Sequence, residues 1–211
     1  MSAKQQRGEA TVERLLTAAL QVYAESGRPG FTVSAVGKAS GVSLGSLYHH
    51  FGSFDGLAAA LYTRCLEQLF DEMITSVRRT RTARTAVRAL VQAYLRFTRE
   101  QHDAALFLHA STNSGYLATH TEEIRDARAA KLGSLAALLR PRIESGEIAP
   151  VPEPMLEVLL LGPVAETARR WLSGGYDIDL AEASRVLPER IWRALRPDGD
   201  HGGQARGPVR P

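Results

Sequence analysis

The feature that most constrains the fold is a pair of short helical patterns joined by a glycine at residues 32–51. Val33, Val36 and Ala39 recur at the spacing of one face of a helix. Gly41 then interrupts the pattern, and glycine reaches positive φ without a steric penalty. We therefore expect a first helix that stops at a tight turn.

A second short helix is predicted directly after this turn, over residues 44–51. Ser43 precedes it and is a good N-cap, because its hydroxyl oxygen can accept from a free amide of the first turn. Leu47 and Phe51 are four residues apart and would share the buried side. Helix, glycine turn and helix together form the helix-turn-helix pattern, whose second helix enters the major groove of DNA.

The other face of the second helix carries small or hydrogen-bonding residues and no acidic one: Gly45, Ser46, Tyr48, His49 and His50. Nothing on this face would repel a phosphate group. An ordinary helical hairpin inside an all-α core is the alternative, because short helix pairs are common.

The same stretch resembles the N-terminal domain of TetR-family transcriptional regulators, within residues 11–61. The matching positions are residues 15–19, 32–33, 41–43, 45–48, 50–51 and Leu57. The rest of the chain resembles this family only in its helical architecture, as expected for a part that binds different ligands in different members.

The resemblance implies eight DNA-binding residues: Thr32, Ser43, Leu44, Gly45, Ser46, Tyr48, His49 and His50. Thr32 and Tyr48 would contact phosphates, and His50 would brace the helix or reach a phosphate. The other five would face the groove, where contacts with base edges supply sequence choice.

Two positions depart from the family pattern. Phe54 stands where many members carry a lysine that contacts the DNA backbone. Gly37 stands where alanine is usual, and glycine lowers helix propensity by roughly 1 kcal/mol. Together they lead us to expect modest DNA affinity or strong reliance on dimerisation.

Composition sets broad limits on the class of protein. The chain has 211 residues, 44% hydrophobic residues and a formal net charge of +3, which permits a nucleic-acid partner without requiring one. Its single cysteine, Cys65, excludes an intramolecular disulfide and a cysteine-rich metal site. No signal peptide is seen, and the richest apolar run, residues 155–165, is too short to span a bilayer. We expect a cytoplasmic protein without a membrane partner.

The predicted fold is all-α, with about nine helices and no strand. Beyond the first pair, apolar residues recur at helical spacing over residues 12–23, 53–80, 87–97, 103–110, 124–139, 155–172 and 179–196. We expect a three-helix helix-turn-helix domain at residues 1–52 and a larger ligand-binding and dimerisation domain at residues 53–197. Residues 198–211 are poor in apolar residues and are expected to form a disordered tail.

Two basic segments allow more than one interpretation. Residues 1–9 are polar and expected to fray, and Lys4 and Arg7 would either belong to a disordered tail or reach into the minor groove. Seven arginines occur between residues 78 and 99. A nucleic-acid patch is one interpretation of these arginines, and a solvated helix face is the one we favour.

A second copy of the chain is the expected partner of the C-terminal helices. The helix at residues 155–172 is apolar nearly all round, so it must be covered on more than one side. The resemblance implies a homodimer built on residues 153–173 and 179–196. A buried core helix in a monomer is the alternative.

Aromatic residues between the predicted long helix and the dimer helices could line a ligand cavity, by analogy with the family. They are Tyr94, Phe97, Phe107, His109, Tyr116 and Trp171. Small-molecule sites are mostly apolar with a few placed polar groups, and this set fits that description. For each residue, a place in the ordinary core is an equal alternative.

The sequence therefore predicts a ligand-responsive transcriptional regulator. We expect a repressor that binds a pseudo-palindromic DNA operator as a homodimer and is released by a small-molecule effector. An activator, or a regulator that responds to a protein partner, is the alternative. An enzyme is disfavoured because no HExxH, GxSxG, P-loop or GxGxxG motif occurs. We expect no catalytic residues, cofactor or metal site.

Overall fold

The computed structural model describes residues 3–111 and 115–197, and within them the chain forms nine α-helices, one 3-10 helix and no strand. The all-α prediction is confirmed. The predicted disordered tail, residues 198–211, lies outside the described residues. No helix in the described part of the chain is long and apolar enough to cross a membrane.

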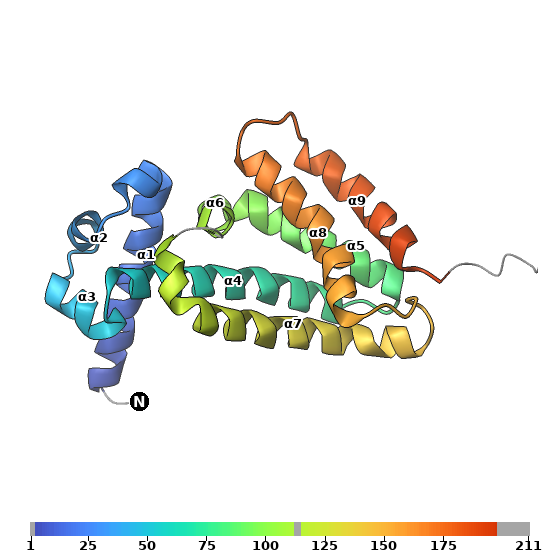
Figure 1. Ribbon diagram of the computed structural model, residues 1–211, viewed down its shortest axis with the longest axis horizontal. Helices are drawn as coiled ribbons and strands as arrows, with labels where there is room; N and C mark the ends of the chain where they lie inside the picture. Colours follow the sequence, from blue (N-terminus) through green and yellow to red (C-terminus); the bar gives the residue numbers. More distant parts are fainter. Residues whose placement is uncertain (1–2, 112–114, 198–211) are drawn as a thin grey trace, which may run out of the picture.

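The helices divide into a small group at one end of an elongated molecule and a larger group along its length (Figure 1). The small group contains α1 (Ala3–Gly30), α2 (Val33–Ser40) and α3 (Leu44–Phe51). The larger group contains α4 (Phe54–Arg78), α5 (Ala83–Glu100), α6 (His102–Ser111), the 3-10 helix η1 (Gly115–His120), α7 (Thr121–Glu144), α8 (Glu153–Leu172) and α9 (Leu180–Leu195).

Helix α1 begins at Ala3, whereas the first nine residues were expected to fray, so the helix starts earlier than predicted. Its regular course ends at Gly27, where φ is 60° and ψ is −165°. Ser26 stabilises this end, since its hydroxyl donates a hydrogen bond of 2.6 Å to the carbonyl oxygen of Val22. The kink turns the chain toward α2 and leaves Phe31 buried.

Helix α4 is the central element of the larger group. It packs against α5 and α7 along its length and contacts α1, α3 and α6 at the end nearer the small group (Figure 1). Its apolar face is fully buried, including Leu61, Cys65 and Met73. Helix α9 in turn packs against α5 and α8.

Four aromatic rings join the two groups of helices. The ring of Phe107 on α6 lies edge-on to Tyr23 of α1, with centroids 4.8 Å apart, and 5.8 Å from the ring of Phe31. Phe54, at the start of α4, completes this aromatic cluster, with its ring 4.9 Å from that of Phe31. Edge-on and tilted pairs of this kind add stability beyond the area they bury.

The arginines of α5 form an outward face, in line with the interpretation we favoured. Arg84, Arg88 and Arg96 are exposed. Arg84 forms an ion pair of 2.8 Å with Glu189 of α9, and Arg96 forms one of 3.5 Å with Glu72 of α4. These arginines therefore tie neighbouring helices together at the surface.

Candidate nucleic-acid interface and central cavity

The turn between α2 and α3 has the geometry that the sequence predicts. Gly41 has φ 63° and ψ 20°, in the left-handed region that glycine adopts without strain. The Thr32 hydroxyl oxygen accepts from the Ala35 amide at 3.2 Å, and the Ser43 hydroxyl oxygen accepts from the Ser46 amide at 3.2 Å. Both helices therefore begin at a serine or threonine cap.

Close packing of the two helices explains Gly37, which the sequence presented only as a weak point of α2. A Cβ atom at this position would lie 3.1 Å from Cδ2 of Leu44, at the start of α3. The glycine therefore lets α2 approach α3 closely. Leu47, which has no exposed surface, holds α3 on its other side.

The outer face of α3 exposes apolar groups to solvent. Leu44 and Tyr48 are each 46% exposed. Ser43, Gly45 and His49 are also exposed, while Ser46 and His50 are half-buried. Apart from the two flanking residues and the backbone of α3 itself, no atom lies within 4 Å of the position that a Cβ atom on Gly45 would take, so another molecule can approach the backbone there.

The charge around this face is positive. Residues 26–54 contain Arg28 and Lys38 and no aspartate or glutamate. Lys38 and Arg28 are exposed, as is Thr32. Arg14 of α1 has a positioning contact, because it donates a hydrogen bond of 2.7 Å to the carbonyl oxygen of Ser40 at the end of α2.

Phe54 does not take up the position of a DNA-contacting side chain, because its ring belongs to the aromatic cluster. The difference from the family pattern thus has a structural counterpart at the junction of the two helix groups. An ion pair of 2.9 Å between Glu13 of α1 and Arg64 of α4 lies at the same junction.

A cavity of about 390 Å³ lies in the larger group, a size within the usual range for small-molecule sites. We call it the central cavity. Five helices, α4 to α8, supply its lining: Tyr62, Leu66, Leu69, Tyr94, Leu108, His109, Arg128, Gly162, Ala165, Glu166 and Arg169.

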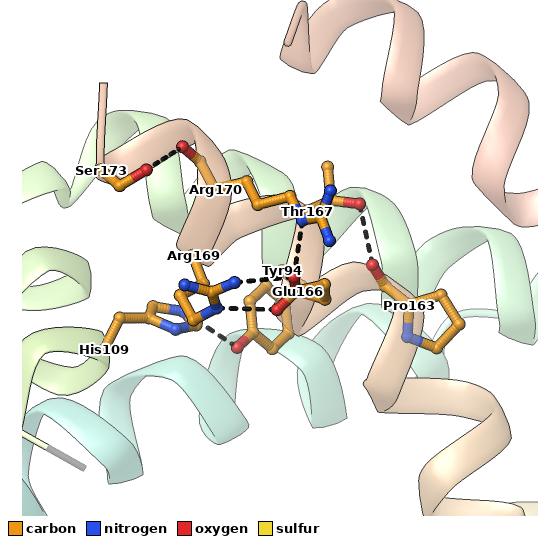
Figure 2. A network of polar contacts seen from close by, with 8 residues as sticks. All are labelled: Tyr94, His109, Pro163, Glu166, Thr167, Arg169, Arg170 and Ser173. Carbon is orange, nitrogen blue, oxygen red and sulfur yellow. Dashed lines mark hydrogen bonds and ion pairs between the residues drawn. The ribbon is translucent and has the colours of Figure 1, made fainter. Parts of the chain in front are cut away.

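A tyrosine and a histidine form the polar contact in the buried part of this cavity. The hydroxyl of Tyr94 lies 3.3 Å from Nε2 of His109 (Figure 2). Burial, together with the smaller effect of the positive charge of Arg169, lowers the pKa of His109 to about 4. Burial also raises the pKa of the Tyr94 hydroxyl. Both side chains are therefore uncharged at neutral pH.

Charged residues of α8 lie at the mouth of the cavity. Arg169 donates from Nε to Oε2 of Glu166 at 2.7 Å and from Nη2 to Oε1 at 2.7 Å (Figure 2). Arg170 donates to the same carboxylate at 2.6 Å. Hydrogen bonds from both arginines lower the pKa of Glu166 to about 2, so the carboxylate stays ionised. Arg128 of α7 pairs with Glu157 of α8.

The structure brings together two of the six residues predicted for a ligand pocket. Tyr94 and His109 both line the central cavity. Tyr116 lies in η1, and its side chain is outside the described part of the structure.

The other three predicted pocket residues lie elsewhere. Phe107 belongs to the aromatic cluster, because its side of α6 faces α1. Phe97 is one turn beyond Tyr94 and borders a different, charged groove between α4 and α5. The Trp171 ring packs against His102, with centroids 5.7 Å apart.

Sequence reasoning missed most of the lining of the cavity. Leu66 and Leu69 lie in the predicted helical segment 53–80, and nothing in the sequence separates a cavity wall from an ordinary core face. Arg128 and Arg169 are charged residues on helices whose neighbours the sequence does not reveal. Among the described residues, no group of three His, Cys, Asp or Glu side chains could hold a metal ion.

Comparison with known proteins gives a family match that runs from within α1 to the first part of α4. The family model for "Bacterial regulatory proteins, tetR family" matches residues 15–61. Over 179 residues the chain is 23% identical to the fatty acid metabolism regulator protein of Bacillus subtilis, covering 84% of this chain and 92% of that protein.

Solved structures of similar proteins share the whole fold. A TetR family transcription regulator from Marinobacter aquaeolei VT8 has a TM-score of 0.73 at 24% identity, over 90% of this chain and 98% of that one. The transcriptional regulator FadR from Bacillus subtilis, solved in complex with stearoyl-CoA, has a TM-score of 0.70 at 22% identity. That comparison covers 85% of this chain and 96% of that one.

Proposed function

This chain is a TetR-family transcriptional regulator, and we propose that it represses transcription as a homodimer on a pseudo-palindromic operator. We further propose that a small molecule in the central cavity releases it from DNA. The observation that carries the DNA-binding part is the outer face of α3. It exposes Leu44 and Tyr48 beside a backbone open to close approach and lies in a stretch without acidic residues.

The position of each residue supports its proposed role on DNA. Tyr48 and Thr32 contact phosphates, and the N-terminus of α2 adds favourable dipole charge next to Thr32. Leu44 meets a thymine methyl group, and His49 contacts a base edge. Ser43, Gly45 and Ser46 face the groove as well, and half-buried His50 supports the helix from the side.

The second copy binds the outer faces of α8 and α9. Met155 is 48% exposed, Val158 57% and Val186 46%, so this surface carries three of the large apolar side chains that the described chain leaves in water. Exposed apolar groups collected on neighbouring helices mark an interaction site. Two-fold symmetry would place two α3 helices about 34–36 Å apart or somewhat more, on successive major grooves.

Release by a ligand needs a physical link from the cavity to α3, and α6 supplies it. His109 lines the cavity, and Phe107, two residues earlier, belongs to the aromatic cluster against α1. The fatty acid metabolism regulator and the stearoyl-CoA complex among the similar proteins support an effector with an apolar chain. The ligand changes DNA affinity only as far as it prefers one dimer geometry to the other.

Fluorescence anisotropy on labelled DNA from upstream of the chain's own gene tests the proposal, beside a scrambled duplex and at two salt concentrations. We expect sequence-dependent binding that weakens steeply with salt, because phosphate contacts release counterions. Tyr48→Ala should abolish this binding. Tyr176→Ala is the matched control, because Tyr176 is 53% exposed in the segment between α8 and α9. Equal binding to both duplexes, even for operators selected from a random pool, would refute the proposal.

The dimer is tested separately, by light scattering during gel filtration. Val158→Glu should produce monomers and weaken operator binding, because it puts charge into an apolar contact. Ala130→Glu on the exposed side of α7 is the control and should remain dimeric. A dimer that tolerates Val158→Glu would rule out this face.

A further inference from the structure

We propose that the central cavity binds an amphipathic carboxylic acid, whose carboxylate replaces that of Glu166 on Arg169. This inference rests on the proposed function, because it names the ligand class of the same cavity. It concerns which groups of this chain recognise the ligand and where each part of the ligand lies.

The inner wall suits an apolar group. Leu66 and Leu69 of α4 and Leu108 of α6 contribute apolar side chains there, and all three are buried. An apolar chain that leaves water for such a wall gains free energy in proportion to the area it buries. This wall therefore accounts for the hydrocarbon part of the ligand.

The buried polar pair supplies no counter-charge for an acid. Tyr94 and His109 are uncharged at neutral pH, because burial opposes both the phenolate and the imidazolium forms. An ionised acid placed beside them would lose its hydration without gaining a counter-charge. The pair offers hydrogen bonds without a counter-charge, whereas Arg169 in the cavity lining offers both, so the acid group of a ligand is better placed at Arg169.

Arg169 at the mouth already holds a carboxylate in the geometry that a ligand acid would need. Its Nε and Nη2 each donate at 2.7 Å to a different oxygen of Glu166, which is the forked arrangement that guanidinium favours with carboxylates (Figure 2). Arg169 lines the cavity and lies close enough to His109 to lower its pKa. An acid that enters with its chain inward would therefore meet Arg169.

Replacing Glu166 is not demanding, because this ion pair is exposed to water. The side chain of Arg169 is 51% exposed and that of Glu166 is 44% exposed. Exposed ion pairs add little net stability, so either partner can be exchanged. Glu166 also keeps a partner after the exchange, since Arg170 donates to it at 2.6 Å.

The balance of charge at the mouth favours one added acid. Arg128, Arg169 and Arg170 face two carboxylates among the described side chains, those of Glu157 and Glu166. A single carboxylate from a ligand would neutralise the remaining positive charge. A cation or a second positive group would be repelled.

Isothermal titration with dodecanoate and with 1-dodecanol tests the proposal, because the two probes share their chain and differ in charge. The full-length wild-type protein should bind dodecanoate at least about tenfold more tightly. Arg169→Gln should remove this preference and leave dodecanol binding unchanged. Glu166→Gln should strengthen dodecanoate binding alone, since it removes the competing carboxylate. Arg99→Gln is the matched control, because Arg99 pairs with Glu100 at 2.8 Å and does not line the cavity.

Three outcomes would overturn the proposal: equal affinity for both probes, a preference that persists in Arg169→Gln, or no binding of dodecanoate by the wild-type protein. Operator anisotropy without any probe separates this failure from failure of the proposed function. A wild-type protein that distinguishes operator from scrambled DNA but shows one of these outcomes retains its function and lacks this ligand class.

Discussion

The junction between the two helix groups depends on Phe107, and replacing it with alanine should show how much. This side chain has no exposed surface, and its ring contacts those of Tyr23 at 4.8 Å and Phe31 at 5.8 Å. Both partners belong to the segment that carries the helix-turn-helix. The substitution would therefore leave an empty space between α6 and α1, without touching α3 or the central cavity.

The expected loss follows from the burial of this ring. Replacing a buried phenylalanine with alanine lowers the free energy of unfolding by about 3–5 kcal/mol, through lost transfer free energy and the cavity that remains. The two edge-on ring contacts place Phe107 in the upper part of this range, because each such pair is worth about 0.5–1.5 kcal/mol beyond its area. We expect about 4–5 kcal/mol for Phe107→Ala.

Urea denaturation followed by circular dichroism measures this loss, at one fixed protein concentration because a dimer's stability depends on it. Phe97→Ala is the matched control, since Phe97 is only 1% exposed but packs between α4 and α5. Both variants should lose similar stability. The milder pair, Phe107→Leu and Phe97→Leu, should remain folded well enough for DNA-binding assays.

The two leucine variants separate a structural role from a transmitting one. With dodecanoate as the ligand, Phe107→Leu should reduce the effect of ligand on operator affinity, and Phe97→Leu should retain it. A loss of less than about 1 kcal/mol for Phe107→Ala would contradict the packing argument, since ordinary surface changes stay within about 0.5 kcal/mol. Equal ligand responses in the two leucine variants would contradict the role of α6 in transmission.

Three further predictions concern the histidine, the turn and the departure from the family. The pKa of His109 is about 4 in the folded protein and 6.5 for the free side chain. Between these values the unfolded chain binds a proton that the folded chain does not bind, so the free energy of unfolding falls as the pH drops from 7 to 5. This loss should be about 2 kcal/mol in urea titrations and absent from His109→Gln. Gly41→Ala should destabilise the protein by about 1–2 kcal/mol in the same assay, because φ is 63° there. Phe54→Lys should lower the melting temperature, because it breaks the ring contact with Phe31. It should also steepen the salt dependence of operator binding by about one released counterion, as expected for one added phosphate contact. An unchanged slope would show that no phosphate lies within reach of this side chain.

Local signals made the helix-turn-helix predictable from the sequence. The positive φ at Gly41 and the cap at Ser43 each depend on residues within four positions along the chain. Gly37 is the exception, because the reason for it is the 3.1 Å approach of Leu44, which belongs to the next helix. A contact between two helices leaves no recognisable pattern in the sequence of either helix alone.

The cavity was predictable only in part, because the direction of each side chain depends on which helices surround it. Helix α6 is apolar on most sides, so the sequence does not say that Phe107 faces α1 and His109 faces α8. Tyr94 and Phe97 are likewise one turn apart on α5 and reach different spaces. The packing of the helices decided which of the predicted residues line the central cavity.

The mouth of the central cavity and the aromatic cluster are the two ends of the proposed signal, and they differ in exposure and packing. This difference would allow a ligand bound at one end to affect the helices at the other. At the mouth of the cavity, Glu166 and Arg169 are about half exposed, so exchanging one carboxylate for another changes the free energy little. At the junction, Phe107 is fully buried between rings, and packed interiors have few alternative arrangements. A ligand can therefore enter easily, while any displacement of α6 must move α1 with it rather than be absorbed by loose side chains. Helix α1 also carries Arg14, whose hydrogen bond to Ser40 holds the end of α2, so the same displacement reaches the helix-turn-helix.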